Sequence, residues 1–532
     1  MGSQNEHIVM LPFMAHGHLI PFLALARQIR RRTGFTVTIA NTPFNIQYLR
    51  STMNSSSSPS EPNICLVELP FSVADYGLPA NTENSENLPL DLIGKFFTAS
   101  TSLKNPVHCL LSDIVAKEGK PPLCVISDVF FGWANEVAKS VGTVNLSFST
   151  GGAYGSLAYI SLWLNLPHRQ AGSDKFHLPG FPDSCRFHIT QLHQFLRNAD
   201  GTDLWSKFMQ PQISLSLQSF GFLCNTAEEI EPLALEWLRK YIKLSVWTIG
   251  PLLPPAVLNG SSISCSGSSI SIQRAGKQPG ISTKSCLEWL DLHSPGSVLY
   301  ISFGSQNSIS PSQMMELAIG LEESSKPFIW VIRPPVGFDR KAEFKAEWLP
   351  EGFEELINNR KQGLLVRNWA PQLEILSHKS TGAFLSHCGW NSVLESLSQG
   401  VPIIGWPLAA EQAYNSKMLV EEMGVSVELT RGLQSNITWK EVKKVVDLVI
   451  EPKGKGNDMR NKAMEIRKLM RASATEEREE IGSSVKALDD LVKTLYPEDE
   501  RISQLHELSE WKLGYLALIM LTSSSTDVIL SA

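Results

Sequence analysis

Short apolar runs alternate with longer amphipathic segments along most of this chain. Residues 7–13 form a compact apolar run, and residues 19–31 have the spacing of apolar positions that is typical of a helix. Short strands that alternate with helices of about 10–15 residues indicate βαβ units and a parallel sheet. The first part of the chain therefore predicts strands at 7–13, 35–40, 64–71, 123–130 and 144–149, with helices that include 19–31 and 131–141.

The alternation stops in the middle of the chain and then starts again. Residues 251–284 are rich first in proline and then in serine and glycine, a composition typical of a linker or an exposed loop. Two doubly wound α/β halves joined by a linker are expected, with a ligand cleft at the carboxyl ends of the strands. In the second half we expect strands at 297–303, 327–332, 364–368, 382–385 and 402–405, a helix at 310–323, and further helices that begin near Pro371, Asn391 and Glu411.

These patterns divide the chain into five parts. We expect an N-terminal domain and a C-terminal domain joined by the linker, followed by a last helix and a tail. The tail has a different composition, and we assign it no function. The expected parts are domain 1–250, linker 251–284, domain 285–475, helix 476–496 and tail 497–532.

Composition narrows the class of protein. The chain has 532 residues, a formal net charge of −6 and an ordinary share of apolar residues, 43%, and this charge argues against a nucleic-acid partner. The eight cysteines are scattered, which predicts free thiols. The N-terminus lacks the features of a signal peptide, and the apolar run at 513–521 is too short to span a membrane. We expect a cytoplasmic monomer without stable membrane insertion.

Residues 369–412 contain two strand-to-helix turns with polar side chains. Pro371 suits the first turn of a helix, because a proline lacks the N–H that would be unpaired there. In the second turn a strand ends at His387, Gly389 permits close approach of the backbone, and Asn391 and Ser392 stand where a helix begins. Free N–H groups, a helix dipole and an imidazole around one point favour the binding of phosphate.

This segment resembles the 44-residue donor signature of plant secondary-product UDP-glycosyltransferases. The resemblance extends from a histidine motif near the N-terminus to about residue 495. It implies the GT-B fold, in which two doubly wound, Rossmann-like domains face each other across a cleft. In that fold the N-terminal domain is expected to bind the acceptor and the C-terminal domain the UDP-sugar, and the last helix, 476–496, is expected to return to the N-terminal domain. It also implies a UDP-sugar as co-substrate and no further cofactor.

The resemblance assigns a part of the donor to each position of the motif. Each residue has a simpler interpretation when it is taken alone: Trp369 as core, His387 as structural and Glu395 as a solvated helix residue. Their joint spacing favours the donor site, and the last residue of the motif, Gln412, goes with glucose in the family. The implied contacts are Trp369 and Ala370 with uracil, Gln372 and Glu395 with ribose, His387, Asn391, Ser392 and Ser305 with the diphosphate, and Trp390, Glu411 and Gln412 with the sugar.

A histidine just after the first predicted strand is the candidate base. Histidine has a pKa suited to proton transfer near neutral pH. The family's catalytic histidine corresponds to His18, and the preceding His16 departs from the usual pattern. His16 could line the acceptor pocket or cap the turn.

Asp128, at the end of the run 123–130, is the candidate partner of His18. A carboxylate is costly in such a position unless it is paired, and in the family the matching aspartate orients the histidine. The alternative is an aspartate that caps the helix at 131–141. Thr150 matches a residue that contacts the transferred sugar, with a plain strand-end threonine as the alternative.

Together with these residues, the resemblance implies inverting transfer of glucose from UDP-glucose to a hydroxyl or carboxyl group of a small lipophilic acceptor, such as a flavonoid, phenol or terpenoid. No metal is expected, because the Asp-x-Asp signature of many other sugar transferases is absent. A non-catalytic metabolite-binding protein and a nucleotide-sugar epimerase are alternatives, and a dehydrogenase is disfavoured because no GxGxxG follows a predicted strand. Residues that could line an apolar acceptor pocket, or belong to the core instead, are Met14, Phe131, Trp133 and Tyr154.

Overall fold

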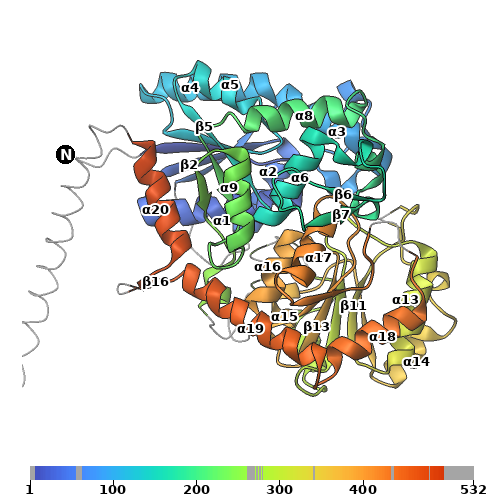
Figure 1. Cartoon of the computed structure of the whole chain (residues 1–532). Coiled ribbons are helices and arrows are strands. Elements are labelled where there is room, and N and C mark those ends of the chain that lie inside the picture. Colours follow the sequence, from blue (N-terminus) through green and yellow to red (C-terminus); the bar gives the residue numbers. More distant parts are fainter. Residues whose placement is uncertain are drawn as a thin grey trace, which may run out of the picture.

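The chain folds into two lobes, each built on a parallel sheet with helices on both faces (Figure 1). This computed structural model describes residues 6–54, 63–259, 270, 274, 277, 279–339, 342–432, 436–477 and 480–496. The predicted tail, 497–532, lies outside the described residues. The expected α/β class with two doubly wound sheets is confirmed.

The first lobe contains a seven-stranded parallel sheet in the order β3-β2-β1-β4-β5-β8-β9. Its central strands β1 and β4 are buried along their whole length, which is why most of their residues are apolar. The strands are β1 (His7–Leu11), β2 (Thr36–Asn41), β3 (Ile64–Glu68), β4 (Cys124–Asp128), β5 (Val144–Ser149), β8 (Gly221–Cys224) and β9 (Val246–Thr248). Its helices are α1 (His16–Thr33), α2 (Pro43–Asn54), α3 (Ile93–Ala99), α4 (Lys104–Glu118), α5 (Ala134–Ser140), α6 (Ala153–Asn165), α7 (Gln194–Asn198), α8 (Leu204–Ser216), α9 (Pro232–Ile242) and α10 (Pro255–Leu258).

The second lobe contains a six-stranded parallel sheet in the order β12-β11-β10-β13-β14-β15. Here too the central strands β10 and β13 are fully buried. The strands are β10 (Val298–Ser302), β11 (Phe328–Ile332), β12 (Gly363–Arg367), β13 (Thr381–Ser386), β14 (Ile403–Gly405) and β15 (Ser426–Glu428). The helices are α12 (Thr283–Leu290), α13 (Pro311–Ser324), α14 (Phe353–Asn359), α15 (Gln372–Ser377), α16 (Trp390–Ser398), α17 (Gln412–Glu421), α18 (Trp439–Ile450) and α19 (Lys455–Ser473).

Local signals account for several helix ends. Ser310 caps α13 and forms a capping box with Gln313, while Pro311 takes the first helical position. Thr438 caps α18 in the same way. The first helix, α1, begins at His16, three residues before the start expected from its apolar spacing, so His18 lies in its first turn.

The last described helix, α20 (Ser483–Leu495), lies against the first lobe although it follows the second in sequence (Figure 1). Its buried residues Leu488 and Leu491 belong to the same apolar core as strands β1 and β2. The indole N–H of Trp247 in β9 donates to Asp490, at 2.9 Å. The chain therefore crosses between the lobes twice, once through the segment 251–284 and once between α19 and α20.

Candidate active site

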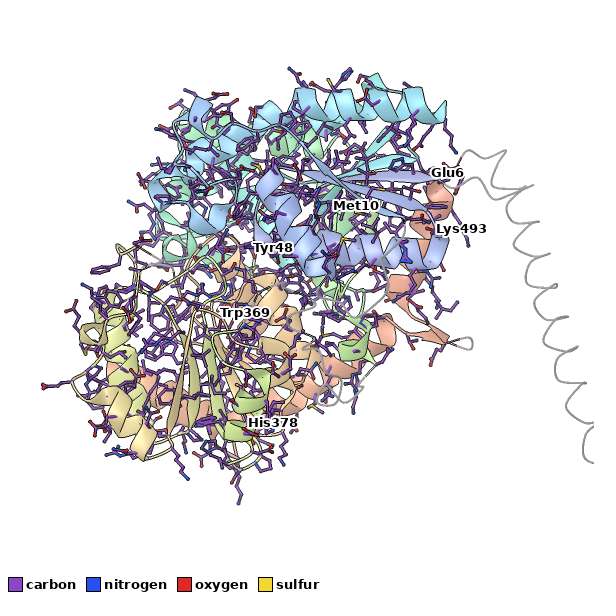
Figure 2. The ribbon with its side chains drawn as sticks, turned by 180° about the vertical axis from the view of Figure 1, so that it is seen from behind. Glu6, Met10, Tyr48, Trp369, His378 and Lys493 are labelled. Atoms are coloured by element: carbon purple, nitrogen blue, oxygen red, sulfur yellow. The ribbon has the colours of Figure 1, made fainter. Side chains whose placement is uncertain are left out.

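The cleft between the lobes holds a cavity of about 590 Å³ whose walls come from both sheets. In each sheet the strand order reverses between two central strands, β1 and β4 in the first and β10 and β13 in the second. Ligands of such sheets bind at the carboxyl ends of the strands beside this reversal. Figure 2 shows Tyr48 of the first lobe and Trp369 of the second on the facing sides of this cleft, and both line the cavity.

His18 and Asp128 meet at the reversal point of the first sheet. Nδ1 of His18 lies 2.6 Å from Oδ2 of Asp128, which is fully buried at the end of β4. Oδ1 of the same carboxylate accepts the backbone N–H of Phe130, so Asp128 pairs with the histidine and also caps the following turn. Thr150, after β5, places its hydroxyl 3.4 Å from Nδ1 of His18. These contacts hold the proton on Nδ1 and leave Nε2 of His18 as the basic nitrogen.

The charge around His18 sets its protonation. Burial alone would lower the pKa of His18, but the Asp128 carboxylate, through its charge and its hydrogen bond, raises that pKa above the ordinary value of histidine. Glu411, from the opposite lobe, acts in the same direction. The pair is therefore suited to take up a proton at the imidazole.

His387 occupies the reversal point of the second sheet and is held between two glycines. A Cβ at Gly304 or at Gly389 would stand 2.5 Å from Nε2 of His387. Burial, helped by the charge of Arg333, lowers the pKa of His387 to about 4, so this imidazole is neutral at physiological pH. Ser305, the residue after Gly304, also lines the cavity, and its carbonyl accepts from Arg333 at 2.9 Å.

A connected group of polar side chains follows along α15 and α16. Nε2 of Gln372 donates to Oε2 of Glu395 at 2.7 Å and lies 3.2 Å from Oγ of Ser392. Oε1 of Gln372 accepts from the hydroxyl of Tyr300 on β10 at 3.1 Å. The sequence did not identify Tyr300, because its apolar strand gives no sign of a polar contact. Trp369 and Ala370, which precede α15, also line the cavity.

The residues expected near the sugar lie where α16 and α17 face the first lobe. Trp390 lines the cavity, but its indole N–H donates to the carbonyl of Asn225 in the first lobe, at 2.7 Å. The neighbouring Asn391, which is expected at the diphosphate, likewise donates to a carbonyl of the first lobe, that of Gly17, at 3.1 Å. Glu411 is half-buried, and the loss of water around its carboxyl raises the pKa of that group. Oε1 of Gln412 accepts two backbone N–H groups, those of Leu408 and Ala409, which leaves its NH₂ group as a donor.

Aromatic side chains form the wall of the cavity on the side of the first lobe. Phe130 and Trp205 lie there together with His193, and burial lowers the pKa of that histidine to about 4. Within the described residues this wall contains no lysine, arginine, aspartate or glutamate. It consists of Ile93, Phe97, Val129, Phe130, Tyr159, Ile160, His193, Gln194, Phe195, Trp205 and Ile213.

The acceptor residues suggested by the sequence prove to be core. They are buried inside the first lobe and do not line the cavity: Met14, Phe131, Trp133 and Tyr154. His16 does line the cavity, with Nδ1 at 3.0 Å from Oε2 of Glu86 and its ring against that of Tyr48. The N-cap of α1 is Ala15, so His16 does not cap that helix.

Three cationic residues of the cavity were missed by the sequence analysis. Arg274 and Lys277 come from the segment 251–284, and Arg333 follows β11. Their local sequences contain no periodic pattern or motif that would have pointed to the cleft. No group of three or more histidine, cysteine, aspartate or glutamate side chains among the described residues could hold a metal ion.

Two family models match the chain. The model described as "Glycosyltransferase, N-terminal domain" matches residues 5–254, and the model described as "UDP-glucoronosyl and UDP-glucosyl transferase" matches residues 283–470. Within the described part of the chain, no helix is both long and apolar enough to cross a bilayer.

Known proteins resemble the chain over nearly its whole length. UDP-glycosyltransferase 92A1 of Arabidopsis thaliana is 43% identical over 92% of this chain and 97% of its own length. Crocetin glucosyltransferase 3 of Crocus sativus is 45% identical over 86% of this chain and 93% of its own length. The structure of Medicago truncatula UGT71G1 with UDP-glucose is similar, with a TM-score of 0.73, 25% identity and coverage of 92% of this chain and 98% of that one. This chain belongs to the plant UDP-glycosyltransferase family, whose members transfer a sugar from a UDP-sugar to an acceptor.

Proposed function

We propose that this protein transfers glucose from UDP-glucose to a hydroxyl group of a small lipophilic acceptor, with inversion at the anomeric carbon. The observation that carries the proposal is the His18–Asp128 pair, which faces the polar residues of the second lobe across one continuous cavity. An uncharged base with an oriented tautomer is what deprotonation of an acceptor hydroxyl requires.

In the proposed step, Nε2 of His18 removes the proton of the acceptor hydroxyl. The acceptor oxygen forms a bond to the anomeric carbon, and the bond from that carbon to the β-phosphate oxygen breaks, so its electron pair leaves with UDP. The carboxylate of Asp128 remains ionised and stabilises the imidazolium that forms. His387, neutral because its pKa is lowered to about 4, contributes a hydrogen bond and no full charge to the leaving diphosphate.

The donor contacts extend along the second lobe. Trp369 would stack on the uracil, Glu395 and Gln372 would hold the ribose, and Ser305, His387, Asn391 and Ser392 would surround the diphosphate. The free NH₂ group of Gln412 is a donor for a sugar hydroxyl and supports glucose as the transferred sugar.

The aromatic wall of the cavity on the side of the first lobe is the proposed acceptor site, called the acceptor wall below. Its side chains support an uncharged, largely apolar acceptor. Aromatic side chains such as Phe97, Phe130 and Trp205 bury flat apolar surface well, and His193 is neutral. A carboxylate acceptor would lack a cationic partner on this wall as described, which favours a hydroxyl over a carboxyl group.

Replacement of the base tests the proposal. His18→Ala should lower the rate of glucoside formation, measured by product mass with UDP-glucose and a panel of phenols, by about 10²–10⁴-fold. UDP affinity should stay within about twofold, because His18 contacts the acceptor rather than the nucleotide. His378→Ala is the matched control, since Figure 2 places that histidine on the second lobe away from the cleft.

Wild-type protein that binds UDP-glucose but yields no glucoside with any phenol would favour the non-catalytic alternative. Full activity of the His18→Ala variant would remove His18 as the base. A changed sugar nucleotide formed without any acceptor would favour an epimerase.

A further inference from the structure

An arginine from the segment between the lobes reaches into the part of the cleft proposed to bind the donor. Nε of Arg274 donates to Oε1 of Glu395 at 2.7 Å, and Nη1 donates to the carbonyl of Leu252 at 2.8 Å. Nη2 lies 3.4 Å from Oδ1 of Asn391. The side chains of Arg274 and Glu395 are 4% and 10% exposed, so the ion pair is almost completely removed from water.

The position of this guanidinium matters because of the charge of a nucleoside diphosphate. The cavity-lining residues between 369 and 412 include no lysine or arginine, although they are the expected donor contacts. His387 is neutral, as its lowered pKa of about 4 requires. A diphosphate buried among neutral groups is less stable than one beside a cation, so a positive charge from another part of the chain would stabilise it.

The other cations of the cavity have different positions. Lys277 pairs with Glu86 of the first lobe, on the side of the cleft opposite Glu395. Arg333 donates to the carbonyls of Ser305 and Asn368. Arg333 therefore lies near the expected diphosphate contacts Ser305 and His387. Among the described lining residues, Arg274 is the cation that bonds to the expected ribose contact Glu395 and also reaches Asn391.

The ion pair also conflicts with the expected role of Glu395. One of its oxygens accepts from Arg274 and the other from Gln372, at 2.7 Å each. Ribose hydroxyls that donate to Glu395 would compete with Arg274 and Gln372 for these oxygens. A buried guanidinium does not leave its carboxylate unless another anion takes it up, and a diphosphate beside Asn391 would be such an anion.

We propose that Arg274 is a donor-binding residue that exchanges partners: it holds Glu395 in the free enzyme and pairs with the diphosphate of a nucleoside diphosphate when the donor binds. Glu395 is then released to the ribose hydroxyls, and each charge keeps a partner throughout. The proposal rests on the proposed function, because it assumes that the donor is a UDP-sugar bound along residues 369–412.

The test compares the affinities of UDP and uridine, measured by calorimetry, in the wild type and in Arg274→Ala. Both ligands must displace Arg274 from Glu395, so the ratio of the two dissociation constants isolates the contact with the diphosphate. Arg274→Ala should bring the advantage of UDP over uridine down by about tenfold or more, as expected for the loss of a hydrogen bond between charged groups. Arg274→Lys should retain part of that advantage, because it keeps the charge and loses the planar donor group.

Arg431→Ala is the matched control, because it removes an exposed arginine of the second lobe that does not line the cavity, and its ratio should equal that of the wild type. If Arg274→Ala bound both ligands more tightly but kept the wild-type ratio of the UDP and uridine dissociation constants, Arg274 would only occupy the pocket without contacting the diphosphate. That result would overturn the proposal. Wild-type protein that binds neither ligand would overturn the proposed function as well. Failure of the proposed function is thus distinguishable from failure of the Arg274 proposal alone, in which the wild type still binds UDP. Should Arg274→Ala not fold, Arg274→Gln, which preserves the length of the side chain without its charge, gives the same comparison.

Discussion

At the scale of single residues, Asp128 controls the protonation of the proposed base. Its carboxylate raises the pKa of His18, and only neutral His18 can accept a proton, so kcat/KM of the wild type should fall as the pH drops through that raised pKa. Asp128→Asn removes the charge that raises the pKa, so the acidic limb of the pH profile should move to lower pH. The maximal rate should also fall, by about 10²–10⁴-fold, since the imidazolium loses its partner.

The measurement is a pH profile of glucoside formation for the wild type and Asp128→Asn. Thr150→Val serves as a comparison, because it removes the 3.4 Å contact with His18 and preserves the carboxylate, so its acidic limb should stay at the pH of the wild type. An Asp128→Asn profile whose acidic limb stays in place would contradict the assignment of that limb to His18.

Some residues of the site could be predicted from the sequence and others could not. His18 follows strand β1 and Asp128 ends strand β4, and parallel strands bring such positions to one edge of the sheet. Arg274 lies in a serine- and glycine-rich segment, where neither periodicity nor a motif indicates the direction of a side chain. Its contact with Glu395 depends on how the two lobes and their connection fold together, which a local pattern does not specify.

The aromatic residues of the acceptor wall show a second limit of prediction from sequence, which concerns whether an apolar side chain faces the core or a ligand. Phe130 lines the cavity while its neighbour Phe131 is buried in the core, because the backbone turns there and the alternation of a strand has ended. In α6, Tyr154 is core and Tyr159 lines the cavity. That helix is apolar on almost every side, so its spacing cannot separate a face toward the core from a face toward a ligand.

At the scale of elements, the turn after β10 places the backbone of Gly304 directly against the ring of His387. Gly304 has a φ of +73°, and a Cβ there would stand 2.5 Å from Nε2 of His387. Gly304→Ala should therefore lose about 1 kcal/mol of unfolding free energy from the left-handed backbone and a further 1–3 kcal/mol from the clash. The clash should also displace His387 and weaken UDP binding.

Gly34→Ala is the matched control for this turn. Gly34 ends α1 with the same φ of +73°, but a Cβ there would meet nothing within 4 Å. Urea unfolding should give only the backbone cost of about 1 kcal/mol for Gly34→Ala, with unchanged UDP affinity. Equal losses of stability and equal UDP affinities in the two variants would show that the space around His387 does not matter.

Elements with long apolar runs were predicted well, whereas several short strands were missed. The run 123–130 identified β4, but the strand ends at Asp128, because the N–H of Phe131 bonds back to the carbonyl of Asp128 and starts a turn. The strands β8, β9 and β15 have only 4, 3 and 3 residues and were not predicted. Runs of this length carry no period, and their neighbours in the sheet decide their conformation.

At the scale of the whole molecule, the lobes meet through a shared apolar core in addition to the ligand cleft. Helix α6 of the first lobe packs on α17 of the second, and a Cβ at Gly155 would stand 2.4 Å from Oδ1 of Asn415. The ring of Phe187 lies 6.0 Å from that of Tyr414. These contacts, together with α20 on the first lobe, fix the two halves of the site relative to each other.

Trp390 contacts both lobes beside the cavity. Its role in holding the lobes together can be distinguished experimentally from a contact with the sugar. Its indole N–H donates to the carbonyl of Asn225, and its ring packs so closely on Gly152 that a Cβ there would stand 2.6 Å away. Trp390→Phe preserves a ring and leaves the Asn225 carbonyl unpaired, which should cost about 1–3 kcal/mol of unfolding free energy. Because the bond positions one lobe on the other, we expect UDP and UDP-glucose to lose the same factor in affinity. A loss confined to UDP-glucose, with unchanged stability and UDP affinity, would instead assign the indole to the sugar, as the sequence alone had suggested.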